Sequence, residues 1–191
     1  MAGDLGARRG QVHAEAQAVL TFWFALSEEK QFAKDQALDR EIADRFGALR
    51  AHVLAEGARG WRDDPDTLLA AVILLDQFSR NLHRGSAEAF AADPLAVELA
   101  LHAIEQGWDG RLPAERRAFL YMPLMHAEDA ELQTLSVEKF QALGLRTNLD
   151  FARAHRDAIA RFGRFPGRNG ALSRETTPDE QRWLEDNDGG W

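Results

Sequence analysis

Cysteine is absent from this chain of 191 residues. Its absence excludes disulfide bonds, thiolate catalysis and zinc sites built on cysteine. The sequence also lacks a glycine-rich phosphate loop and a nucleophile elbow, so it indicates no cofactor and no specific class of enzyme. A chain without cysteine fits the reducing cytoplasm, and we expect a cytoplasmic location.

Long apolar runs and an excess of basic residues are absent too. The longest uninterrupted apolar run, Leu68–Leu75, has eight residues, whereas a membrane-spanning helix needs about 20. The formal net charge is −8 and the pI is about 5.3, which disfavours bulk nucleic acid as a partner. We therefore expect neither a membrane nor nucleic acid as a partner. Residues 1–11 carry no apolar stretch behind their charges, so we predict a flexible tail rather than a signal peptide.

A strand-type alternation of apolar and polar residues is missing as well, and apolar residues recur at helical spacing throughout. We predict an all-α fold in which residues 12–186 form a single domain, followed by an acidic tail at residues 187–191. Short loops favour antiparallel helix pairs, and no clear repeat of tetratricopeptide length is visible. The seven or eight expected helices cover about residues 13–25, 35–56, 93–107, 127–143 and 146–162, with others that begin near residues 64, 113 and 177.

The helix that begins at Asp64-Pro65 is expected to lie at the centre of the fold. Its start combines a capping residue with proline at the first helical position, and Leu68–Leu75 is apolar on every side. The apolar stripe then continues into Asp76 and Arg80, which are spaced to form an ion pair. This pair is either a structural feature or part of a binding site, and the pattern alone leaves both open.

Pro123 lies well inside the helix that is expected to begin near residue 113. It cannot donate to the carbonyl of Phe119, and its ring clashes there, so we expect the helix to kink or end. His126 follows on the inward face, close to Glu128 and Asp129. It is either a core histidine bonded to a carboxylate or a general acid/base tuned by Glu128 or Asp129.

His155 is a second inward histidine, since Phe151 and Ile159 flank it at helical spacing. Together with His126 and the nearby acids it resembles a possible metal site. The spacing matches no metal motif, however, because no two histidines stand four residues apart on one helix. We expect no metal.

Seven arginines lie between Arg146 and Arg174 against two aspartates, and we call them the arginine island. Crowded guanidinium groups repel one another, so they usually face bound anions or partner carboxylates. Arg161, Arg164 and Arg168 cross a helix end into a loop that continues to Asn169. The acidic C-terminal segment offers an alternative, because it could fold over the arginine island and neutralise it.

Four stretches carry a resemblance to a known family: Leu20–Phe24, Leu75–Gly85, Phe119–Asp129 and His155–Asn169. With these stretches the chain resembles the uncharacterised bacterial family known as domain of unknown function 924. The resemblance runs from about residue 19 to residue 184. It implies a tetratricopeptide-like array of helices, and it implies no established activity.

The chain departs from that family's pattern at four positions. The pattern has proline where Ser79 stands, glutamate at Met125, serine at Ala127 and histidine at Gly167. Three of these differences remove polar or rigid groups from the candidate site. A mechanism that needs a carboxylate at position 125 or an imidazole at position 167 is therefore not expected here.

Three separate segments break their helical pattern with the same mixture of arginine, asparagine, histidine and acid. If they meet, they form an enclosed polar pocket that binds a small anionic ligand, with acid/base hydrolysis as the chemistry it could support. No nucleophile stands out, so catalysis and binding alone both stay open. The predicted catalytic residues are His126, Glu128 and His155, and the predicted ligand-binding residues are Asp76, Arg80, Asn81, Arg84, Tyr121, Arg161, Arg164, Arg168 and Asn169.

A scaffold is the alternative function. Helical arrays often hold peptides in a concave groove, and here the arginines would clamp an acidic peptide or the carboxylate terminus of a partner protein. Either function is compatible with a monomer or a homodimer. The aromatic run Phe22–Phe24 is a candidate for a dimer contact.

Overall fold

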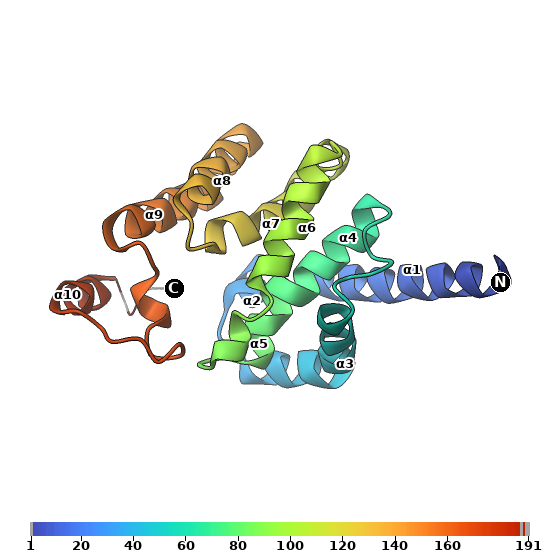
Figure 1. Ribbon diagram of the computed structural model, residues 1–191, viewed down its shortest axis with the longest axis horizontal. Coiled ribbons are helices and arrows are strands. Elements are labelled where there is room, and N and C mark those ends of the chain that lie inside the picture. Colours follow the sequence, from blue (N-terminus) through green and yellow to red (C-terminus); the bar gives the residue numbers. More distant parts are fainter. Residues whose placement is uncertain (1, 188, 190–191) are drawn as a thin grey trace.

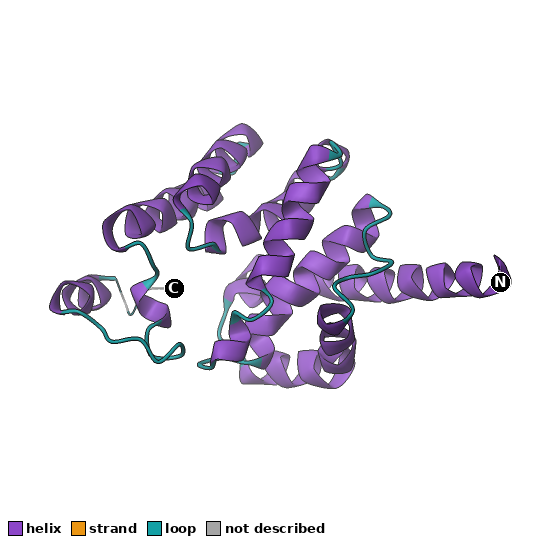
Figure 2. Ribbon diagram, viewed as in Figure 1, coloured by secondary structure: helices purple, strands orange, loops and turns teal. Residues whose placement is uncertain are grey.

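The computed structural model describes residues 2–187 and residue 189, with side chains from residue 9 onward. All regular structure in this part of the chain is helical, which confirms the predicted all-α fold (Figure 2). The principal elements are α1 (Ala2–Ala25), α2 (Glu28–Phe32), α3 (Gln36–Ala55), α4 (Pro65–Val72), η1 (Ile73–Phe78), α5 (Ser79–Leu82), α6 (Asp93–Glu105), η3 (Asp109–Arg111), α7 (Ala114–His126), α8 (Ala130–Leu143), α9 (Arg146–Phe162), η4 (Pro166–Arg168) and α10 (Pro178–Asp186).

The central helix is a continuous run of α4, η1 and α5. Asp64 caps it by accepting hydrogen bonds from the backbone N–H groups of Asp66 and Thr67, and Pro65 occupies the first turn. Every residue from 67 to 79 is buried, which confirms its predicted position. Its segment η1 is a π-helix, a wider turn that often occurs at functional sites. Counted as one helix, this run brings the described residues to nine helices, and α2 is the additional one that the sequence did not predict.

The other helices surround the central one. Helix α1 packs on α4, α3 packs on η1 and α5, and α6 packs against both α4 and α7, which also contact each other. Helices α7, α8 and α9 then pack in sequence, and α9 lies at the far end from α1 (Figure 1). A cluster of aromatic rings fills the core, with ring centroids 5.1–6.1 Å apart: Phe22, Trp23, Phe46, Phe78 and Phe119.

This aromatic cluster changes the interpretation of Phe22–Phe24. Phe22 and Trp23 are buried in the core of the chain itself, at 8% and 0% exposure. These two side chains are therefore not available as a dimer contact, whereas Phe24 is partly exposed. Their apolar surface stabilises the fold by packing against the central helix.

The N-terminal segment differs from the prediction. Helix α1 begins at Ala2, so residues 2–11 are helical where a flexible tail is expected. These turns project beyond the neighbouring helices (Figure 1). Extending an existing helix adds one hydrogen bond per residue without a new nucleation step, which explains how a segment outside the core continues the helix. At the other end, Asn187 is the C-cap of α10, and residues 188, 190 and 191 of the predicted acidic tail lie outside the described residues.

Helix α7 continues through Pro123 and ends three residues later, at His126. Of the two outcomes expected at the proline, a kink or an end, the helix does not end there but about one turn later. Gln133 of α8 stabilises this last turn, because its Nε2 donates to the carbonyl oxygens of Met125 at 2.6 Å and Ala127 at 2.8 Å. These bonds satisfy carbonyl groups that a helix end leaves without partners.

Helix α9 matches its predicted range, and Gly163 ends it in the left-handed conformation with a φ of 69°. The chain then forms η4 and reaches α10, which begins with a capping box between Thr177 and Glu180. Helix α10 contacts η4, so the acidic C-terminal segment lies against the loop that carries Arg168. No helix in the described part of the chain is long and apolar enough to cross a bilayer.

Candidate functional site

A pocket of about 730 Å³ lies where α2, η1, α5, α7, α9 and η4 meet. Its volume falls within the range of sites for small organic ligands. Its deep wall carries Gln77, His126 and Arg168, which are all largely buried, whereas Phe32 and Phe151 stand at the exposed rim. The pocket therefore has a polar inner wall, and its rim carries two aromatic rings together with the charged side chains of Glu28 and Lys34.

Asp76 lies directly behind this inner wall and is 1% exposed. Its Oδ1 is 2.8 Å from Nδ1 of His126 and 3.0 Å from Nη1 of Arg80, and its Oδ2 accepts from Nε2 of Gln77 at 2.6 Å. Because a carboxylate only accepts hydrogen bonds, the proton of a neutral His126 belongs on Nδ1. Nε2 is then an acceptor, and it makes no hydrogen bond to a described residue.

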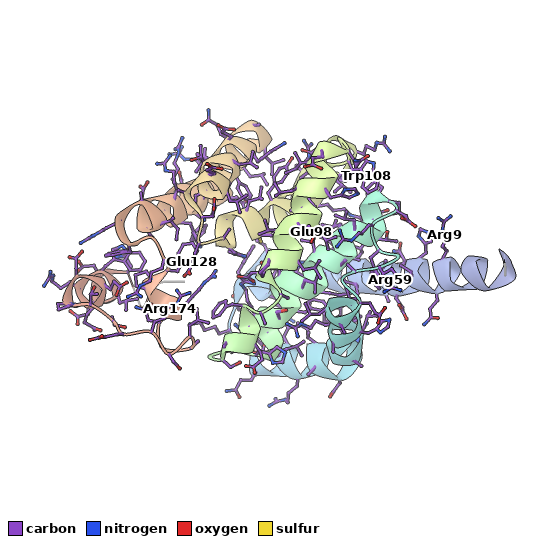
Figure 3. The ribbon with its side chains drawn as sticks, viewed as in Figure 1. Arg9, Arg59, Glu98, Trp108, Glu128 and Arg174 are labelled. Atoms are coloured by element: carbon purple, nitrogen blue, oxygen red, sulfur yellow. The ribbon has the colours of Figure 1, made fainter. Side chains whose placement is uncertain are left out.

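The carboxylate beside His126 is therefore not one of the two expected from the sequence. Glu128 accepts from the backbone N–H of Phe165 at 2.9 Å and pairs with Arg174 at 2.8 Å, as Figure 3 shows for its labelled side chains. Asp129 instead caps α8. The chain turns to an extended conformation at Ala127, so the two acids leave the face of the helix on which His126 lies.

The partly buried Arg80 and the buried Arg168 meet at one further carboxylate. Both Nη atoms of Arg80 donate to Asp93, at 3.1 and 3.2 Å, and Nη1 of Arg168 donates to the same carboxylate at 3.2 Å. Nη2 of Arg168 donates to the backbone carbonyl of His126 at 2.8 Å. Arg80, His126 and Arg168 thus lie within one connected network, which fulfils the predicted convergence of three separate segments.

Two aromatic rings orient the guanidinium group of Arg168. Its carbon lies 4.5 Å from the ring centroid of Phe90 and 4.7 Å from that of Phe165. Contact with the faces of aromatic rings stabilises a cation and restricts its orientation. Nε of Arg168 makes no hydrogen bond to a described residue.

Burial and neighbouring charges both shift the pKa values of the side chains in this network. Burial disfavours the charged form of Asp76, but the charge of Arg80 and the contact with His126 outweigh it and hold the pKa of Asp76 well below its usual range. Burial lowers the pKa of His126, and this effect exceeds the attraction of Asp76. Burial and the repulsion of Arg80 lower the pKa of Arg168 to about 10. His126 is therefore neutral at neutral pH, and Arg168 is a cation whose charged form burial disfavours.

His155 lies beside His126, with ring centroids 6.0 Å apart. Its Nδ1 is 2.9 Å from the backbone carbonyl of Phe151, so this nitrogen carries the proton. Burial, together with the nearby His126, lowers the pKa of His155 to about 3. Both histidines are thus neutral side chains on the wall of the pocket.

The depressed pKa of His155 predicts that mild acid destabilises the fold. A histidine in the unfolded chain titrates near 6.5, whereas folded His155 titrates near 3. Within this window the unfolded chain binds a proton that the folded chain does not bind, so the free energy of unfolding decreases as the pH falls. We expect His155→Gln to remove a slope of up to about 1.4 kcal/mol per pH unit between pH 6 and pH 4. Urea unfolding at several pH values measures this slope for the wild type and for the variant.

His52→Gln is the matched control, because His52 lies exposed on α3. This control should keep the slope of the wild-type protein. Equal slopes for the wild type and His155→Gln would contradict the prediction.

The structure brings about half of the predicted site residues to the pocket. Arg84 and Asn81 stand on its wall, where both donate to Asp39, at 2.6 and 2.8 Å. Asp76 lies behind the wall and acts through Arg80 and His126. The predicted residues that line the pocket are Arg80, Asn81, Arg84, His126, His155 and Arg168. The predicted residues that do not line it are Asp76, Tyr121, Glu128, Arg161, Arg164 and Asn169.

The acidic C-terminal segment explains three of these six differences. Arg161 pairs with Asp179 at 2.8 Å, and Arg164 pairs with Glu180 at 2.7 Å. Asn169 also donates to Glu180, at 3.3 Å. This part of the arginine island is therefore neutralised by α10, as the alternative interpretation of the sequence proposed, and only Arg168 reaches the pocket.

Tyr121 belongs to a separate polar contact. Its hydroxyl donates to Asp109 of η3 at 2.7 Å, and Lys139 donates to the same carboxylate at 3.1 Å. Burial and the bond to Asp109 raise the pKa of Tyr121. These contacts connect η3, α7 and α8, away from the residues that line the pocket.

The sequence does not predict a site role for three residues. The pattern at Asp93 predicts only the start of a helix, although Asp93 connects Arg80 with Arg168. The spacing of Phe151 indicates only that it flanks His155. Phe32 lies at the end of α2, whose sole local signal is the cap at Ser27, which accepts from the N–H of Lys30 at 3.4 Å. A helix of five residues is too short to produce a periodic pattern.

Within the described residues, no three histidine, cysteine or acidic side chains are grouped so that they could hold a metal ion. The geometry instead combines a neutral imidazole, a buried carboxylate and two arginines. Such a combination can bind an anion and exchange a proton with it.

Comparisons with known proteins place the chain in a family. It is similar to the solved structure of a protein of unknown function from Agrobacterium tumefaciens, with 41% sequence identity and a TM-score of 0.87. That similarity covers 91% of this chain and 98% of the other. A comparison with curated proteins gives no match. Residues 19–188 match the family described as "Bacterial protein of unknown function (DUF924)". The chain therefore belongs to the DUF924 family, as the four sequence motifs indicate.

Proposed function

We propose that the pocket binds a small organic anion and that Nε2 of His126 exchanges a proton with the ligand or with a water molecule beside it. The observation that carries the proposal is the position of Arg168 next to the Asp76–His126 pair, at the inner wall of one pocket. The anion would contact Arg168, and the imidazole would lie beside it.

The charge distribution favours an anionic ligand. Arg80 and Arg168 share the carboxylate of Asp93, while Asp76 is already occupied by Arg80 and His126. Burial and Arg80 lower the pKa of Arg168, so additional negative charge near its guanidinium group would stabilise it. The Nε of Arg168 supplies a donor for that purpose.

The Asp76–His126 pair favours acid/base chemistry. A carboxylate that accepts from Nδ1 holds the imidazole in one tautomer and stabilises the imidazolium that forms when Nε2 takes a proton. Nε2 can therefore act as a general base toward a water molecule or a ligand hydroxyl. This is the arrangement that hydrolysis through an activated water molecule requires, and it needs no protein nucleophile.

Binding is tested by thermal shift with a panel of small carboxylates and phosphates. A ligand at 100 times its dissociation constant adds about 2.7 kcal/mol to the free energy of unfolding. We expect at least one acid to stabilise the wild type and Arg168→Met to abolish the shift. Arg156→Met is the matched control, because Arg156 belongs to the same arginine island but lies outside the pocket, and this variant should keep the shift.

Two further results would decide the outcome. If Arg168→Met does not fold, Arg168→Lys replaces it and should bind the acid more weakly than the wild type while keeping some affinity. If no acid or phosphate stabilises the wild type at millimolar concentration, the proposed anion site is wrong.

The role of His126 is tested by proton uptake. An anion beside the neutral imidazole raises its pKa, so binding near pH 6 should take up a fraction of a proton. Titration calorimetry in two buffers of different ionisation enthalpy measures this fraction. We expect uptake in the wild type and none in His126→Gln, and uptake that persists in the variant would exclude His126 as the acceptor.

The alternative scaffold function has less support. It requires Arg161 and Arg164 to clamp an acidic partner, and both already pair with carboxylates of α10. Tetratricopeptide-like packing and a cytoplasmic location stay predictions from the sequence. The same is true of the oligomeric state.

A further inference from the structure

Phe32 and Phe151 are the two large apolar side chains that remain mainly exposed in the described part of the chain, at 54% and 49%. A single exposed apolar side chain is common on protein surfaces. These two come from separate helices, α2 and α9, and both line the mouth of the same pocket. Their shared position therefore requires an explanation beyond chance exposure.

The two rings stand on helices that also carry other residues of the pocket or contacts to its wall. Phe32 stacks on Phe119 of α7 with ring centroids 6.1 Å apart and planes 10° from parallel. Phe151 lies one helical turn before His155, whose Nδ1 contacts its carbonyl oxygen. Below the rings, Met122 and Met125 contribute buried, adaptable apolar surface to the wall.

The pocket therefore offers both polar and apolar surface to a ligand. Arg168 and His126 line its inner wall, where they are 9% and 17% exposed. The two rings stand at its rim, together with the charged side chains of Glu28 and Lys34. Its volume of about 730 Å³ is that of a site for a drug-sized molecule rather than for a lone inorganic anion. A ligand that matches this arrangement is itself amphipathic.

We infer that the natural ligand is an organic acid with an aromatic or alkyl body, bound with its anionic group on Arg168 and its apolar body between Phe32 and Phe151. This inference rests on the proposed anion site and specifies the class of its ligand. Burial of the two rings against the ligand would remove apolar surface from water, which favours binding.

The test compares acids that share a carboxylate and differ in their apolar part. Titration calorimetry measures acetate, butyrate, hexanoate and phenylpropionate, with inorganic phosphate and the uncharged phenylpropanol as references. Each buried methylene should strengthen binding by about fourfold. Hexanoate and phenylpropionate should therefore bind at least tenfold more tightly than acetate or phosphate.

Substitutions test whether the rings of Phe32 and Phe151 cause the tighter binding of the more apolar acids. The double variant Phe32→Ala with Phe151→Ala should weaken phenylpropionate at least tenfold and leave acetate unchanged within about twofold. Both side chains are mainly exposed, so the variant should fold. Phe162→Ala is the matched control, because Phe162 also lies on α9 but outside the pocket. This control variant should bind phenylpropionate as tightly as the wild type.

The possible failures are distinct. If acetate or phosphate binds as tightly as phenylpropionate, or if the double variant binds phenylpropionate like the wild type, the amphipathic ligand class is wrong and the anion site still stands. If phenylpropanol binds as tightly as phenylpropionate, the anion site itself is overturned. If none of the acids binds, both proposals fail.

Discussion

Asp76→Asn should destabilise the protein by about 3–5 kcal/mol, because it removes the charge that compensates a buried arginine. The carboxylate of Asp76 is 1% exposed and contacts Arg80 and His126, which both depend on it as an acceptor. Asparagine keeps the shape but offers one oxygen, and its amide group would face the amide donor of Gln77. In a protein of this size such a loss lowers Tm by about 10 °C. Urea unfolding and thermal melts measure both quantities.

The matched control is Asp66→Asn. Asp66 also pairs with an arginine, Arg116 at 2.9 Å, but its side chain is 59% exposed. Solvent screens such pairs, so the control should cost less than about 1 kcal/mol. Equal losses in the two variants would show that the Asp76 network does not stabilise the fold.

Asp76→Asn should also change how steeply the free energy of unfolding falls in acid. The folded pKa of Asp76 lies below the unfolded value of 3.8. Its charge therefore contributes stability above pH 3.8 that is lost as the pH falls further through the folded value. Below pH 4 the variant should lose stability less steeply than the wild type.

Ile73→Asp should unfold the protein or cost more than about 4 kcal/mol. Ile73 is 0% exposed at the start of η1, in the middle of the central helix. A carboxylate there either remains charged without a partner or is neutralised by protonation, and both states cost free energy in an apolar core. Thermal melts should show a Tm at least about 10 °C below that of the wild type, or no cooperative transition.

Two controls separate the charge from the loss of packing. Ile73→Val removes only one methylene group and should cost about 0.5–1.5 kcal/mol. Ile104→Asp places the same charge at a half-buried isoleucine of α6, and it should cost clearly less than Ile73→Asp. If Ile73→Asp melts within about a degree of the wild type, the assignment of the central helix is wrong.

The site depends on η4 as much as on the helices that line it. Arg168 reaches the pocket because the N–H of Phe165 donates to Glu128, and because α10 lies against η4. Glu180 accepts two hydrogen bonds from Arg164, at 2.7 and 2.9 Å, which hold the pKa of Glu180 at about 2. The acidic C-terminal segment thus positions the one arginine of the island that faces the pocket.

The sequence by itself determined the long helices, apart from the N-terminal extension of α1, and their buried faces. Asp64-Pro65 predicted the start of the central helix, Leu68–Leu75 predicted its burial, and residues 146–162 formed the predicted helix. These features depend on residues within a few positions of one another, since capping, apolar periodicity and helix-ending glycines act locally. The inward direction of His126 and His155 followed from the same periodicity.

Only the tertiary structure decided which partners these side chains meet. Periodicity indicates the face on which a residue lies, but not which helix packs against that face. His126 therefore appeared to belong with Glu128 or Asp129, although its carboxylate is Asp76, 50 positions away in the chain. Arg164 and Arg168 look equivalent in the sequence, and only the packing of α10 neutralises the first and leaves the second at the pocket. Contacts between distant segments depend on the packing of whole helices, and no local pattern in the sequence specifies that packing.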